Sequence, residues 1–210
     1  MQESNYDKFK RDALVRFLTY DQDALIRRLG LEADEEYIYI TFCQKQYRLH
    51  RGQPLMEIKH PCSWLEADSN AVLTICDLLC HTPDPIRLSG NYTSLESLNR
   101  VKGGTTSTQL GDGFFGKGVK LFDGACEDLA AACRSLGGVP MGKGDVAFRI
   151  PLFGNIALQL SFYESDDEFP AQLTVFLDSD ICNYLFFETL WYMVGMVLET
   201  ITEKMLEKDI

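Results

Sequence analysis

Two spacings of apolar residues alternate along the first third of the chain. Apolar side chains recur every three or four positions over residues 4–19, which is typical of a helix with one buried face. A shorter helix is expected from Asp21, whose carboxylate can cap free backbone amides, to Gly30. The spacing then changes to two over residues 37–50, which predicts a pair of antiparallel strands, and a weaker strand at 55–58 would complete a small meander. The predicted buried stripe of the first helix is Tyr6, Phe9, Ala13, Phe17 and Leu18.

The middle of the chain predicts two helices on either side of a glycine-rich stretch. The first begins at Asp68 or Ser69, either of which can cap it, and prolines 83 and 85 end it. The second covers residues 125–136 and is expected to be capped by Asp123. Between them, residues 87–118 show little periodicity, so we expect a long surface excursion that contains a short strand or helix.

The clearest pattern is in the last third of the chain. Alternating apolar residues predict strands at 146–150, 156–163 and 173–177, and a helical stripe from residue 190 to 205 predicts a long final helix. Because strands come in runs rather than alternating with helices, the fold class is α+β with a mainly antiparallel sheet, N-terminal helices, two middle helices and a long C-terminal helix. We expect a single domain over residues 1–210, in which residues 1–66 could form a helix–meander subdomain.

Composition and charge restrict the partners. The chain has 210 residues, 46% of them hydrophobic, and its formal net charge of -11 repels phosphate backbones and anionic lipid. We therefore expect no nucleic acid and no membrane as a partner. The apolar segment 181–198 is interrupted by Asn183 and Glu188 and is interpreted as a core helix. The first residues lack a basic region followed by an apolar run, and seven cysteines are an odd number, so we expect a soluble cytoplasmic protein with free thiols.

A glycine-rich loop at residues 111–118 (GDGFFGKG) resembles two nucleotide-binding patterns. It matches the dinucleotide glycine spacing and misses a phosphate-binding loop by one residue, because Gly118 stands where a hydroxyl is required. The preceding residues 105–109 are polar, so the required strand is absent. We interpret the segment as an irregular loop that is pinned by buried Phe114 and Phe115.

Four cysteines lie in pairs on the two middle helices. Cys76 and Cys80 share one helical face, as do Cys126 and Cys133, so a four-thiolate site would form if those helices packed together. No Cys-x-x-Cys pair is present, and free cysteine commonly behaves as a small buried hydrophobe, which is the interpretation we prefer. The histidines are expected at the surface: His50, His60 and His81.

An acidic loop at residues 164–170 joins the last two predicted strands. Its carboxylates could coordinate a hard cation such as magnesium or calcium. Asp178 follows the next strand, but in an antiparallel hairpin that end lies away from the loop. The alternative is a solvated turn with Phe169 tucked beneath it and Pro170 fixing the return to the sheet, and we favour this structural role. The candidate ligand-binding residues are Glu164, Asp166, Asp167, Glu168 and Asp178.

The same region resembles the prokaryotic domain of unknown function 3786 family. The resemblance rests on the acidic Phe-Pro turn at 166–170, the strand corner at 176–179, and Tyr184-Leu185 before a helix that Glu188 opens. The family carries glycine where Ser165 stands here. It has no assigned activity; some relatives carry a cysteine-rich iron–sulfur segment or occur beside corrinoid proteins. The resemblance therefore implies a context of anaerobic metabolism, although no such cysteine segment is visible in this chain.

Three functions stay open from the sequence. The leading hypothesis is a non-catalytic module that binds a partner protein or a small ligand, since the surface is acidic and no catalytic signature is present. The second is a metal-assisted, hydrolase-like enzyme that uses the acidic loop. The third is an accessory protein that handles an iron–sulfur or corrinoid group through its cysteines.

Overall fold

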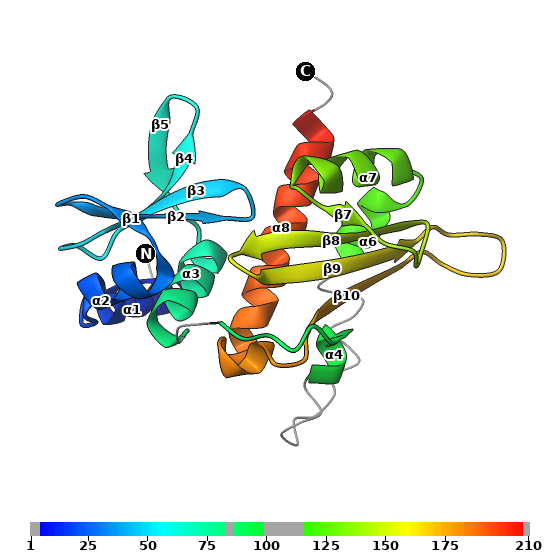
Figure 1. Cartoon of the computed structure of the whole chain (residues 1–210). Coiled ribbons are helices and arrows are strands. Elements are labelled where there is room, and N and C mark those ends of the chain that lie inside the picture. The colour runs from blue at the N-terminus through cyan, green and yellow to red at the C-terminus, as the bar shows by residue number, and fades with distance from the viewer. Residues whose placement is uncertain (1–4, 83–85, 99–115, 208–210) are drawn as a thin grey trace. The chain divides into compact units, whose positions relative to one another are not determined.

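The computed structural model describes residues 5–82, 86–98 and 116–207, which form two compact units (Figure 1). Unit 1 comprises Met1–Arg87 and Cys182–Met193, and unit 2 comprises Leu88–Ile181 and Val194–Ile210. The long C-terminal helix α8 (Phe187–Leu206) contributes its first turns to unit 1 and the remainder to unit 2. Helices and antiparallel sheets confirm the predicted α+β class. A single domain over residues 1–210, with a subdomain over 1–66, stays a prediction.

Unit 1 combines three helices with an antiparallel meander. The strands pair in chain order, from β1 to β5, and the register places Ile38 opposite Leu49 and Ile40 opposite Tyr47. All four side chains are buried, because they point to one face of the meander, so the strands predicted over 37–50 and at 55–58 are confirmed. The elements are α1 (Asn5–Phe17), α2 (Gln22–Leu29), β1 (Glu32–Ala33), β2 (Tyr37–Phe42), β3 (Lys45–His50), β4 (Met56–His60), β5 (Ser63–Glu66) and α3 (Ser69–His81).

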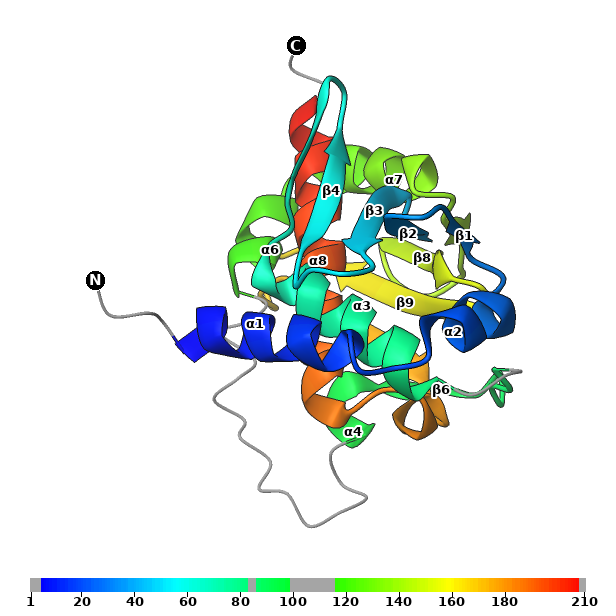
Figure 2. The same ribbon diagram turned by 90° about the vertical axis from the view of Figure 1, so that its left-hand side faces the viewer.

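The buried stripe predicted for α1 is wrong at its N-terminal end. Leu14 and Phe17 are buried, whereas Tyr6 and Phe9 are 59% and 55% exposed. The partner of α1 is α3, and in Figure 2 the first turns of α1 extend beyond α3. The buried apolar residues of α1 therefore lie in its C-terminal half.

The ends of α2 and α3 follow the capping chemistry that the sequence predicts. The carboxylates of Asp21 and Asp68 accept hydrogen bonds from the amides of Ala24 and Ala71, each at 2.9 Å. Gly30 closes α2 with φ of 62°, in the left-handed region that favours glycine. Each helix therefore begins at the predicted residue.

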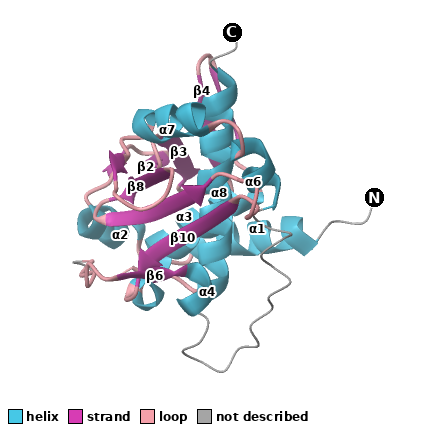
Figure 3. Ribbon diagram, turned by 90° about the vertical axis from the view of Figure 1, so that its right-hand side faces the viewer, coloured by secondary structure: helices cyan, strands magenta, loops and turns pink. Residues whose placement is uncertain are grey.

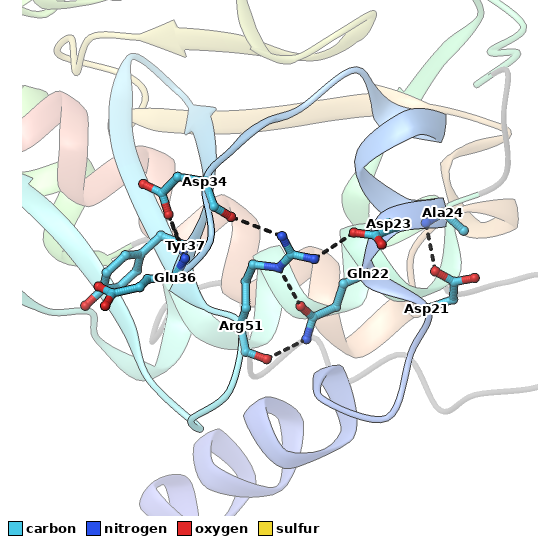
Figure 4. Close-up of polar contacts among 8 residues, drawn as sticks. All are labelled: Asp21, Gln22, Asp23, Ala24, Asp34, Glu36, Tyr37 and Arg51. Atoms are coloured by element: carbon cyan, nitrogen blue, oxygen red, sulfur yellow. Dashed lines mark hydrogen bonds and ion pairs between the residues drawn. The ribbon is translucent and has the colours of Figure 1, made fainter.

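Arg51 joins α2 to the meander (Figure 4). Its guanidinium donates to the carboxylate of Asp23 at 2.6 Å, to the carbonyl of Asp34 at 3.0 Å and to the side chain of Gln22 at 3.3 Å. Gln22 in turn donates to the carbonyl of Arg51 at 2.9 Å. These bonds account for every donor nitrogen of the guanidinium, so the role of Arg51 is structural.

Unit 2 is built on a second antiparallel sheet, whose strands are magenta in Figure 3. The strand order is β6-β10-β9-β8-β7, and α7 packs against β7 and β8. Phe148, Leu160 and Val175 are buried, and they represent the apolar face that the alternation predicted. The elements are β6 (Tyr92–Ser94), α4 (Leu95–Leu98), α6 (Gly116–Phe122), α7 (Cys126–Ser135), β7 (Val139–Pro140), β8 (Val146–Phe153), β9 (Ile156–Tyr163), β10 (Gln172–Asp178) and the 3-10 turn η2 (Ile181–Asn183), which precedes α8.

The described part of the stretch at 87–118 contains a short strand, β6, and a short helix, α4, which confirms the short element predicted there. Its first part supplies β6, which pairs with β10, and its last residues open α6 at Gly116. The prediction missed this helix. Most of the glycine-rich loop at 111–118, with Phe114 and Phe115, lies outside the described residues.

In the part of the chain that the structure describes, no helix is both long and apolar enough to cross a membrane.

Candidate ligand-binding site

The acidic loop connects β9 to β10, as predicted, and Asp166 organises it from within. One carboxylate oxygen of Asp166 accepts the amides of Glu168 at 2.8 Å and Phe169 at 2.7 Å, which is an Asx-type turn. The side chains of Asp167 and Glu168 are exposed. Phe169 is 62% exposed, so the prediction that it tucks beneath the loop is wrong: the Asp166 carboxylate holds the turn and no apolar anchor is needed.

The base of the loop is tied to the connection between α6 and α7. The amide and hydroxyl of Ser165 donate to the two carboxylate oxygens of Asp123 at 2.9 and 2.8 Å. Glu164 accepts the amide of Gly124 at 2.8 Å, and its own amide donates to Asp145 at 2.8 Å. The sequence predicted that Asp123 caps α7, and this prediction is wrong. Its carboxylate is engaged by the loop, and α7 has no side-chain cap. Here the carboxylates stabilise a turn through backbone amides.

Asp178 lies at the other end of β10 and serves a different turn. Gln172, at the loop end of the strand, pairs with Tyr163, whereas Asp178 pairs with Tyr92. The buried Asp178 carboxylate accepts the Ser89 amide at 3.1 Å and other donors from the same turn. Burial opposes its ionisation, but the combined hydrogen bonds outweigh burial, so the pKa of Asp178 lies below its usual value. The five predicted site residues are thus not brought together.

The cysteines form no disulfide bond among the described residues, and the two on α3 are buried. Burial raises the pKa of Cys80 to about 11, with the nearby Asp77 carboxylate adding to the effect, and burial also raises the pKa of Cys76. Both are therefore poor thiolate ligands at neutral pH. Within the described ranges, no group of three or more His, Cys, Asp or Glu residues is arranged to hold a metal ion.

A cavity of about 350 Å³ in unit 1 brings together residues that the sequence analysis treated separately. Its walls come from α1, from α3 and from the chain around the start of α8. The lining is mainly apolar; Asp77 is buried in the wall, and the exposed side chains of Asp12 and Arg16 form the rim. The lining residues are Phe9, Asp12, Ala13, Arg16, Leu73, Cys76, Asp77, Cys80, His81, Phe186, Thr189 and Tyr192.

A chain of hydrogen bonds runs along the cavity wall through His81. Its Nδ1 lies 2.7 Å from one carboxylate oxygen of the buried Asp77, and the other oxygen accepts the Phe186 amide at 3.0 Å. Its Nε2 lies 3.4 Å from the hydroxyl of Tyr20, and its ring meets the Phe186 ring edge-on at 4.7 Å. A carboxylate only accepts, so Nδ1 carries the shared hydrogen, and Nε2 is the ring nitrogen left for Tyr20 or a ligand.

His81 is therefore not the ordinary surface histidine that the sequence analysis expected. The available signal was the spacing of four between Asp77 and His81, which places both on one helical face. We considered only the neighbouring pair Cys76 and Cys80, as possible thiolate ligands. The third partner, Phe186, is 109 residues from Asp77, and no local pattern predicts that contact.

Comparisons with known proteins give a family but no close relative of known role. No curated protein and no solved structure matches the chain. The model of one family matches residues 21–200, a range that includes the cavity residues of α3 and α8 and leaves out α1. The chain belongs to the family described as a domain of unknown function (DUF3786).

Proposed function

We propose that this protein is a non-catalytic module that binds a small organic ligand in the cavity of unit 1. The observation that carries the proposal is a mainly apolar cavity in which a buried carboxylate, Asp77, orients one imidazole, His81. Small-molecule sites typically combine apolar walls with a few positioned polar groups.

The size of the cavity sets the scale of the ligand. A volume of about 350 Å³ lies near the lower end of the roughly 300–1,000 Å³ found for small-molecule sites. The ligand is therefore a compact molecule with an apolar body, and a nucleotide or a macrocycle would not be enclosed.

Positioning of His81 favours affinity. Because its Nδ1 is bonded to Asp77 and its ring packs on Phe186, the imidazole has little rotamer freedom left to lose when a ligand binds. A ligand that replaces the 3.4 Å contact with the Tyr20 hydroxyl would meet Nε2 in a fixed direction.

The protonated thiols of the cavity support binding without a covalent step. Burial keeps Cys76 and Cys80 protonated at neutral pH, so neither is an activated nucleophile.

The test is a titration of small aromatic and aliphatic fragments, followed by ligand-observed NMR, on three proteins. The wild type should bind a subset of the fragments. Leu73→Trp places a large ring in the cavity wall and should abolish that binding, whereas Leu65→Trp, on the exposed face of β5, should leave it unchanged. Fragments that bind Leu73→Trp as well as the wild type, or no binding to the wild type, would refute the proposal.

A further inference from the structure

Charges of both signs stand on one rim of the cavity. Asp12 and Arg16 are one helical turn apart on α1, and both line the cavity. At this spacing their Cβ atoms are about 5–6 Å apart, close enough for an ion pair. Neither side chain makes an ion pair or hydrogen bond with the described residues, and both are exposed. The rim thus presents a free carboxylate beside a free guanidinium.

The guanidinium acts on the interior of the cavity and not only on solvent. Burial and the Asp77 carboxylate raise the pKa of Cys80 to about 11, and the positive charge of Arg16 opposes this rise. Cys80 lines the cavity together with Cys76, and both cysteines are buried, whereas Asp12 and Arg16 are exposed. A ligand whose apolar part lies against the buried cysteines would therefore have its polar end beside Arg16 and Asp12.

We propose that the ligand is a free α-amino acid with a large apolar side chain, whose carboxylate binds Arg16 and whose ammonium group binds Asp12. The proposal rests on the proposed function, because it assigns a ligand class to the same cavity. A ligand with only a negative charge would leave Asp12 unpaired beside it, and a purely cationic ligand would do the same for Arg16. A zwitterion satisfies both charges.

The remaining polar groups of the wall fit the same ligand. The hydroxyls of Thr189 and Tyr192 have no hydrogen-bond partner among the described residues, and both line the cavity. Hydroxyls can donate to a carboxylate and accept from an ammonium group. Since α1 lies outside residues 21–200, this specificity is assigned to this chain and not to its family.

The test is isothermal titration calorimetry with L-phenylalanine, L-leucine and L-methionine. Three analogues of phenylalanine complete the panel: 3-phenylpropanoate lacks the ammonium group, 2-phenylethylamine lacks the carboxylate, and 2-phenylethanol lacks both charges. At least one amino acid should bind about tenfold tighter than every analogue, as expected for the loss of one charge-assisted contact.

Matched variants locate the charges. Asp12→Asn and Arg16→Gln should each weaken amino-acid binding about tenfold, and Lys8→Gln, an exposed position of α1 outside the cavity lining, should not. Unchanged affinity in Asp12→Asn and Arg16→Gln would overturn the inference. So would 2-phenylethanol binding as tightly as phenylalanine, although the proposed cavity would then stand. If no compound of the panel binds, the inference fails, and the fragment titration decides the proposed function separately.

Discussion

Removal of the Asp77 carboxylate is the sharpest test of the cavity wall. In Asp77→Ala, both hydrogen bonds that this residue accepts are lost, from Nδ1 of His81 at 2.7 Å and from the amide of Phe186 at 3.0 Å. The first bond fixes the imidazole, and the second fixes the chain that leads into α8. The substitution should therefore destabilise unit 1 and release His81.

The magnitude follows from the two bonds and their burial. Hydrogen bonds to a charged group contribute about 1.5–3 kcal/mol each, so the loss of both lies between about 3 and 6 kcal/mol. The Asp77 side chain is only 7% exposed, but His81 is 31% exposed, so water can reach its ring after the substitution. This places the expected loss in the free energy of unfolding at the lower end, about 3 kcal/mol.

Urea unfolding followed by tryptophan fluorescence measures this loss. The chain has two tryptophans, Trp64 and Trp191, and both belong to unit 1. Asp68→Ala is the matched control, because Asp68 is an exposed N-cap of the same helix and its loss should cost about 1 kcal/mol.

A double-mutant cycle separates the two bonds. In a His81→Ala background, Asp77→Ala should cost about 1.5 kcal/mol less than in the wild type, because the bond to His81 is already gone. The reasoning would be refuted if Asp77→Ala destabilised unit 1 no more than Asp68→Ala, or if the cycle showed no coupling.

Three further outcomes test the carboxylates and thiols elsewhere. The pKa of Asp178 is lowered in the folded state, so the wild type should exceed Asp178→Asn in free energy of unfolding by a constant amount above about pH 5 and by less below about pH 4. A difference, measured by urea unfolding, that increases on acidification would contradict this. Asp123→Ala should speed hydrogen exchange of the Ser165 amide roughly tenfold, equal to about 1.4 kcal/mol, and unchanged protection by mass spectrometry would count against the anchoring role. At pH 7.5, iodoacetamide should label the exposed Cys62 well before the buried Cys76, whereas equal rates in peptide mass spectra would show that burial does not govern reactivity.

The strands predicted over residues 37–50 carry the clearest signal. In β2 and β3, buried and less buried residues alternate, so a shift by one residue would move the apolar set away from the core. Short edge strands lack that signal. β1 (Glu32–Ala33) and β5 (Ser63–Glu66) are too short to show a period, and they exist because a neighbouring strand offers free backbone groups. The tight turn at Cys43 and Gln44 was equally hidden, because φ values of 48° and 63° normally favour glycine or asparagine.

The acidic loop shows that carboxylates crowded together in a sequence can serve as acceptors for the backbone. Asp166 and Glu164 lie in a loop whose backbone amides need acceptors, and the structure uses their carboxylates for those amides. Asp12 and Arg16 lie on an ordinary helical face, where spacing alone indicates only a surface ion pair. What distinguishes them is the cavity beside them, one wall of which is held by the hydrogen bond from the Phe186 amide to Asp77, 109 positions away. A local pattern can predict where carboxylates cluster along the chain. Contacts between residues far apart in the sequence decide which of those carboxylates the fold engages.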